Sequence, residues 1–206
     1  VTLQYVSTTG VTCSETRTIN PNTSAEFAGN GFITGNAALT CAVGQRFIGA
    51  AYVTTNSANQ PLVATVNQDR GSLSSAYGAF DPAAGTPKVA LPQIQDRNGA
   101  VSDWASSFNV MNAGTAATYV KCTFANTAYT VQFGQIAPNG VKEDLQRGKI
   151  APSYVGSGEC TAYTSAAYTT IDTAAKLLAV VNVRGMGVGQ NDLMMSYEGI
   201  NISLTP

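Results

Sequence analysis

The chain contains no histidine, and this absence removes much of the catalytic chemistry that its other residues could support. Imidazole is the usual base near neutral pH and the partner of Ser and Cys nucleophiles, so triads of that kind are excluded. Glu143 and Asp144 form an adjacent pair of acids. Neighbouring residues on a strand point to opposite faces, so this pair does not suit glycoside hydrolysis. We therefore expect a protein that is not an enzyme.

The spacing of the residues also gives little support for a metal-binding or nucleotide-binding site. The aspartates are scattered near turns without a D-x-D-x-D pattern, which leaves calcium binding as a weak alternative. The glycine-rich run Gly185–Gly189 follows a strand-like segment and precedes Gln190-Asn191-Asp192 rather than a helix. A phosphate-binding loop would open a helix, so this run is interpreted as a loop. We expect no cofactor and no catalytic or metal-binding residues.

The four cysteines indicate a disulfide framework. Cys13 and Cys41 lie in the first half of the chain, and Cys122 and Cys160 lie in the second half. Four cysteines allow three pairings, and their equal division favours Cys13–Cys41 and Cys122–Cys160. Two disulfides would place the protein outside the cytoplasm, in an extracellular or cell-surface location. The alternative is four buried thiols in a reducing compartment.

Composition excludes further classes of partner. Charged residues make up 11% of the 206 residues, and the net charge is −1. The 11 Lys and Arg residues are scattered, so no nucleic-acid footprint appears. No apolar run is long enough to span a membrane as a helix. A weakly charged surface tends to associate, which favours a self-assembling protein.

The elements that must position these residues are short strands. Apolar and polar residues alternate in many short runs, separated by Gly, Asn and Pro turn signals. Ala174–Val183 could form a short helix, but we interpret it as a buried strand. Many short strands in units of about 100 residues predict an all-β sandwich architecture.

A weak internal repeat divides the chain into two units. Its period of about 118 residues is too long for a solenoid and suits a small domain. Four segments of the first unit recur in the same order in the second. The matched pairs are 19–22 with 136–139, Cys41 with Cys160, 50–52 with 166–168, and 75–80 with 195–200.

One stretch has no counterpart in the first unit. Residues 88–117 contain the single Trp and are typical of two strands joined by a turn. We predict an incomplete domain over residues 1–80, a Pro-containing linker over 81–87, and a complete domain over 88–199. Residues 200–206 then form a C-terminal tail with the cleanest period-two alternation in the chain, with Ile200, Ile202 and Leu204 on one face.

The second unit resembles a known type of surface repeat. The run VALPQI, the pattern W-x-S-S-F-x-V-M-N-A-G-T and the closing SYEGI are similar to repeats of long secreted surface proteins of Chloroflexota-type bacteria. The resemblance implies immunoglobulin-like (Ig-like) β-sandwiches, no catalytic residues, and a role in surface structure or adhesion. The expected fold is therefore two tandem Ig-like β-sandwich domains, the first of which lacks its opening strands.

These observations lead to a hypothesis of assembly. A sandwich without its first strands exposes unpaired edges and apolar core, and an alternating tail can fill such a groove. We expect Ile200, Ile202 and Leu204 of one subunit to enter an acceptor groove formed by Val1, Leu3 and Tyr5 of the next. The result is an open-ended filament of identical subunits.

Two alternatives stay open. The chain could be a cell-surface adhesin or carbohydrate-binding module that binds surface glycans through loops such as residues 185–192. A viral coat protein is a further structural alternative. Asn22 and Asn201 each begin an N-glycosylation tripeptide, which makes them candidate modification sites in a host that glycosylates.

Overall fold

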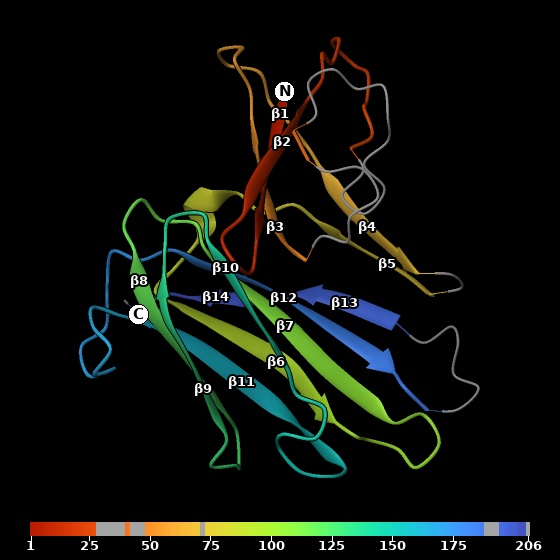
Figure 1. The fold of residues 1–206 in the computed structure, drawn as a ribbon, viewed down its shortest axis with the longest axis vertical. Helices are drawn as coiled ribbons and strands as arrows, with labels where there is room; N and C mark the ends of the chain where they lie inside the picture. Colours follow the sequence, from red (N-terminus) through yellow and green to blue (C-terminus); the bar gives the residue numbers. More distant parts are fainter. Residues whose placement is uncertain (28–39, 42–47, 71–72, 188–193, 205–206) are drawn as a thin grey trace.

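The structure is a computed structural model that describes residues 1–27, 40–41, 48–70, 73–187 and 194–204. The described residues form fourteen strands and one short 3-10 helix, and every strand pairing is antiparallel (Figure 1). The all-β fold class expected from the sequence is confirmed.

The second half of the chain forms two stacked sheets with a shared core. The first of these sheets has the order β14-β6-β11-β8-β9, with β14 at Ile200–Ile202, β6 at Lys88–Asp96, β11 at Tyr154–Tyr163, β8 at Thr118–Phe124 and β9 at Thr130–Ile136. The other sheet has the order β10-β7-β12-β13, with β10 at Val141–Leu145, β7 at Trp104–Asn112, β12 at Leu177–Gly185 and β13 at Met194–Glu198. Residues 88–117 thus contain two strands, β6 and β7, as the sequence predicted.

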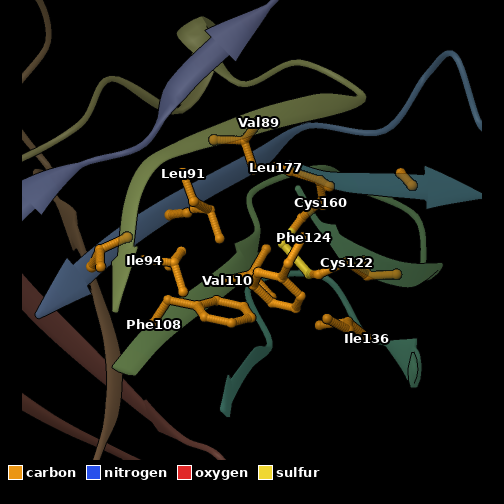
Figure 2. Close-up of a cluster of buried hydrophobic side chains, with 14 of the residues drawn as sticks. Val89, Leu91, Ile94, Phe108, Val110, Cys122, Phe124, Ile136, Cys160 and Leu177 are labelled. Carbon is orange, nitrogen blue, oxygen red and sulfur yellow. A yellow bond between two sulfur atoms is a disulfide. The ribbon is translucent and has the colours of Figure 1, made fainter. Parts of the chain in front are cut away.

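Alternation along the strands produces this sandwich. On β7, Phe108 and Val110 are fully buried, while the alternate residues Asn109 and Met111 are partly exposed. β6 contributes Val89, Leu91 and Ile94, all fully buried, to the same cluster (Figure 2). Burial of each such side chain stabilises the fold by about 1.5–3 kcal/mol. The two strands without a counterpart in the first unit therefore supply a large part of the sandwich core.

The first half of the chain forms two separate sheets. A three-stranded sheet has the order β2-β1-β3, with β2 at Thr12–Thr16, β1 at Thr2–Ser7 and β3 at Gly49–Thr54. A hairpin joins β4 (Thr65–Arg70) to β5 (Leu73–Gly78). β4 and β5 lie near β13 of the sandwich, not against the three-stranded sheet (Figure 1). Among the described residues, the buried cluster of the three-stranded sheet includes no residue of the hairpin. That residues 1–80 form a sandwich domain of their own stays a prediction.

The core of the three-stranded sheet is small. Among the described residues, Tyr5 and Cys41 form its buried cluster, with Leu3 and Cys13 packed against them. Nothing comparable to the sandwich core is present, because no large aliphatic or Phe side chain is fully buried in this unit's described part. The described part of this unit therefore has a small core.

The linker between the halves is short and ordered. Pro82–Ala84 form a 3-10 turn whose start is capped by Asp81, because the Asp81 side chain accepts a hydrogen bond of 2.8 Å from the Ala83 N–H. Thr86 already pairs with Leu177, and the Pro87 carbonyl accepts a hydrogen bond from the Ala162 N–H. The last two residues of the expected linker therefore belong to the sandwich edge.

The structure supports part of the sequence repeat and corrects another part. Asn20–Thr23 and Ala137–Gly140 form the same hydrogen-bonded turn, with Asn22 and Asn139 in the left-handed region at φ 59° and 57°. Residues 50–52 and 166–168 are not equivalent. The first three lie on β3, whereas the second three lie in a turn in which Tyr168 has φ 51°. Short Ala-Ala-Tyr identities carry too little information to fix an element.

Candidate functional site

The residues that could have supported chemistry have structural roles in the described part of the chain. Glu143 is exposed on β10, whereas Asp144 points the other way and accepts a hydrogen bond of 2.7 Å from the Tyr129 hydroxyl. Asp144 also contacts Lys149 and Gln146. Within the described ranges, no three His, Cys, Asp or Glu side chains gather as a metal site would require. Residues 185–192 form the loop through which the adhesin alternative would bind glycans, and residues 188–192 of it lie outside the described residues.

Both disulfides have the pairing that the sequence favoured. Cys13 of β2 is joined to Cys41, and Cys122 of β8 is joined to Cys160 of β11. Cys122 and Cys160 lie directly opposite each other in the β8–β11 ladder and are fully buried. Cys13–Cys41 instead ties the edge strand of the small sheet to the segment that precedes β3. Each disulfide therefore stays within its own unit.

The C-terminal tail is positioned on its own sandwich. Ile200, Asn201 and Ile202 pair with Ala90, Val89 and Lys88 of β6. The contact between the tail and β6 buries little of the tail's apolar surface. Ile200 remains 59% exposed, and Leu204, beyond the paired residues, is 41% exposed. The tail that we expected to bind a neighbouring subunit therefore pairs with its own sandwich over three residues, while two of its three apolar side chains stay in solvent.

The Asn201 side chain forms a hydrogen bond within this arrangement. Its Nδ2 donates a hydrogen bond of 2.5 Å to the Ala84 carbonyl, and its Oδ1 is buried without a partner in the described structure. A glycan at Asn201 would require the tail to leave β6. Asn22, in contrast, is exposed on its turn and free of this constraint. Of the two candidate glycosylation sites, Asn22 alone is accessible in this conformation.

The predicted acceptor residues need a correction. Leu3 and Tyr5 belong to β1, and Val1 extends it, but β1 is the middle strand of its sheet. Arg17 N–H donates to the Val1 carbonyl on one side, and β1 pairs with β3 from Thr2 to Ser7 on the other. A strand that adds to a sheet needs a free edge. Val1, Leu3 and Tyr5 therefore cannot pair with an incoming strand through their backbone.

The two outer strands of this sheet differ in how their edges are covered. Ser14 of β2 donates its N–H to Thr40 Oγ1 at 2.7 Å and accepts from the Thr40 N–H at 2.8 Å, so Thr40 covers that edge. On β3, the register places Ala50, Tyr52 and Thr54 opposite Val6, Gln4 and Thr2.

The outward direction on β3 follows from the ladder pattern. Thr8 N–H donates to the Ile48 carbonyl, which marks the hydrogen-bonded positions as Ile48, Ala50, Tyr52 and Thr54, because these alternate in an antiparallel ladder. The backbone groups of Gly49, Ala51 and Val53 point outward and bond no other described residue. Within the described ranges, β3 is thus the open edge. Sequence reasoning missed it because the alternation of side chains says nothing about which edge is paired.

Exposed apolar side chains accompany this open edge. Val53 of β3 is 38% exposed, and Leu62 and Val63, in the segment that leads from β3 to β4, are 43% and 96% exposed. In a chain with few charges, such side chains mark a surface that association would cover.

Tyr197 holds β13 to the opposite sheet. Its hydroxyl accepts a hydrogen bond of 3.0 Å from the Gln93 N–H and contacts the Gln93 carbonyl. Burial raises the pKa of Tyr197 to about 12, although the hydrogen bond from Gln93 opposes the rise. Tyr197 is therefore neutral at physiological pH and serves as a brace between the sheets.

The chain has no match among known families. Comparison with protein-family models, with curated proteins and with solved structures finds nothing similar to it. In addition, the described residues include no helix that is long and apolar enough to cross a membrane.

Proposed function

We propose that this protein is a structural subunit of an extracellular filament and that it polymerises head to tail by β-strand complementation. The observation that carries the proposal is a three-stranded N-terminal sheet whose β3 edge has no partner among the described residues, combined with a poorly buried C-terminal strand. The unit has an uncovered strand edge and a buried cluster of two residues, Tyr5 and Cys41, in its described part. The tail leaves Ile200 and Leu204 in solvent. Each feature would be stabilised by the other in a neighbouring copy.

The geometry of such a contact makes it open-ended. The donor lies at the end of one unit and the acceptor in the other, so each subunit offers one of each to different neighbours. A contact between two different patches does not close on itself unless the rotation happens to form a ring, and it builds a fibre. Two disulfides are compatible with an extracellular site of assembly.

Removal of the tail tests this function. A chain that ends at Gly199 lacks β14, and a matched control that ends at Leu204 keeps it. We expect the full chain and the Leu204 control to form filaments in negative-stain electron microscopy and to elute in the void volume of a sizing column. The Gly199 variant should elute as a monomer, because it has lost the donor strand. Filaments of unchanged length from the Gly199 variant would contradict strand donation by the tail.

A monomeric full chain would contradict the proposal as a whole. In that case the N-terminal unit would be complete as it stands, and glycan binding would become the next property to measure. The control variant guards against a trivial result, because it removes Thr205 and Pro206 and retains the paired residues Ile200–Ile202.

A further inference from the structure

The strands of the two units correspond one to one except for two. In chain order, β1, β2, β3, β4 and β5 match β8, β9, β11, β12 and β13. The neighbours match as well: β2-β1-β3 has the order of β9-β8-β11, and the hairpin β4–β5 has that of β12–β13. β6 and β7 have no counterpart among the described residues of the first unit, and the counterpart of β10 would fall in a part of the chain that the structure describes incompletely.

Local details agree with this correspondence. The shared turn at Asn22 and Asn139 follows β2 in one unit and β9 in the other. In the hairpins, Val66 lies opposite Tyr77 as Val181 lies opposite Tyr197. Asn67 and Asn182 are the next residues along and again occupy equivalent positions.

The correspondence places the missing strands at defined edges. β6 pairs with β11, and β11 is the counterpart of β3. β7 pairs with β12, and β12 is the counterpart of β4. A complete first unit would thus have one more strand on β3 and another on β4. The edge of β3 that this requires is the edge on which Gly49, Ala51 and Val53 have no backbone partner among the described residues.

The hairpin β4–β5 differs from the three-stranded sheet, because its strand β5 already contacts β13 of the sandwich. Ser75 Oγ lies 2.7 Å from Ser196 Oγ of β13, and Gly78 N–H donates a hydrogen bond of 3.1 Å to the Glu198 carboxylate. Tyr77 projects from the same face of β5 as Ser75. Burial raises the pKa of its hydroxyl. The hairpin therefore faces the second unit with the side of β5 that bears Ser75 and Tyr77. A single strand at β3 would then extend the three-stranded sheet, which lies outside this contact.

We propose that the C-terminal tail of a second copy binds antiparallel to the free edge of β3, in the position that β6 occupies on β11. This inference rests on the proposed filament function and identifies its acceptor. Gly49, Ala51 and Val53 form the backbone ladder with the incoming strand. Ile200, Ile202 and Leu204 take the place of the buried β6 side chains Val89, Leu91 and Ile94.

The tail fits this position better than its present one. Its pairing with β6 covers three residues, whereas β3 offers six residues from Gly49 to Thr54. β6, the strand that holds the equivalent position, buries Val89 and Leu91 completely. Transfer of the tail to β3 of a neighbour would therefore cover Ile200 and Leu204, which are exposed in the single chain. One donor strand per acceptor is also the number that a single tail can provide.

Proline substitution tests the β3 edge directly. Pro lacks the N–H that an incoming strand needs, and it is tolerated on an edge strand where that N–H faces outward. Ala51→Pro removes an outward N–H of β3 without removing a β1–β3 hydrogen bond. Thr12→Pro is the matched control, because Thr12 is an exposed residue of β2, the other outer strand of the same sheet.

We expect Ala51→Pro to abolish filaments and Thr12→Pro to form them as the parent does, by electron microscopy and sizing. Ala51→Val, which keeps the N–H, should also assemble. If the parent forms filaments and Ala51→Pro forms them equally well, the β3 assignment is wrong while the filament function stands. If the parent itself stays monomeric, the function fails first.

Hydrogen exchange of the unmodified chain provides a readout that no folding defect can imitate. The amides of Ala51 and Val53 should exchange rapidly in the monomer and at least tenfold more slowly in filaments. The amides of Ala50 and Tyr52, which face β1, should be protected in both states. Protection that appears on assembly elsewhere in the chain but not at Ala51 and Val53 would overturn the assignment.

Discussion

At the scale of single residues, Asp96 shows how this sparsely charged chain uses a buried carboxylate. Its side chain is fully buried at the end of β6. It accepts hydrogen bonds of 2.8 Å from the Gly148 and Ile150 N–H groups and one of 3.0 Å from Arg97 Nε. Burial alone would raise the pKa of this carboxyl. The hydrogen bonds from Gly148, Arg97 and Ile150 outweigh it and hold the pKa below its usual range.

This arrangement predicts a pH-dependent contribution to stability. Because the pKa in the folded state is depressed, the contribution is complete above the unfolded pKa of about 3.9 and is lost as the pH falls through the lower folded value. Asp96→Asn keeps the shape but replaces one acceptor oxygen with a donor that faces an N–H. We expect a loss of about 1.5–3 kcal/mol at pH 7, measured by urea unfolding, and a smaller difference from the parent below pH 3.

Asp103→Asn is the matched control for this change. Asp103 pairs with Arg147 at the surface, where an ion pair contributes little, and Asn tolerates the left-handed φ of 46° at this position. Its stability should stay within about 1 kcal/mol of the parent. If both variants lost the same free energy of unfolding, the buried hydrogen bonds of Asp96 would contribute no more to stability than the surface ion pair of Asp103.

At the scale of elements, the disulfides have different importance for the two units. Cys122–Cys160 closes a sequence separation of 38 residues inside a large core, whereas Cys13 and Cys41 contribute half of the small cluster around Tyr5 and Leu3. The replacement of Cys13 and Cys41 by Ala should therefore open the sheet β2-β1-β3 and leave the sandwich folded. Hydrogen exchange should rise at least tenfold over residues 2–16 and stay unchanged over residues 104–112.

The reciprocal variant, with Cys122 and Cys160 replaced by Ala, should lower sandwich stability by about 3–4 kcal/mol, and β6 to β9 should remain folded. If the Cys13 and Cys41 variant exchanged as slowly as the parent over residues 2–16, contacts outside the described cluster would be holding the sheet.

Particular elements show what could be predicted from the sequence. Period-two alternation identified β6, β7 and the tail strand, and the strand interpretation of Ala174–Val183 is confirmed by β12. The equal division of cysteines predicted both disulfides. The middle position of β1, the open edge of β3 and the pairing of Ile200–Ile202 with β6 could not be predicted. Alternation shows which face of a strand is buried, but the neighbours depend on long-range contacts that the local pattern does not record.

At the scale of the whole molecule, the two halves share a strand order, but the described part of the first half contains fewer strands than the second. The sandwich contains β6 and β7, and these two strands supply Leu91, Ile94 and Phe108 to its core. The described part of residues 1–80 contains no counterpart of either strand, and its hairpin lies against the outer face of the sandwich. A neighbouring copy can supply a further strand to the N-terminal sheet. A chain with net charge −1 has little electrostatic self-repulsion to oppose this association.

This division predicts two melting transitions that respond differently to assembly. A strand that binds a folded sheet but not an unfolded one raises the stability of that sheet by mass action. The lower transition, which we assign to residues 1–54, should therefore rise by at least 10 °C when monomers assemble. The upper transition, which belongs to the sandwich, should shift by less than about 2 °C, because its core gains no new contacts. Scanning calorimetry of filaments and of the monomeric Ala51→Pro variant measures both. If the lower transition temperature did not rise on assembly, the incoming strand would bind outside this sheet. If the monomer showed a single transition, the N-terminal unit would unfold together with the sandwich that contacts its hairpin.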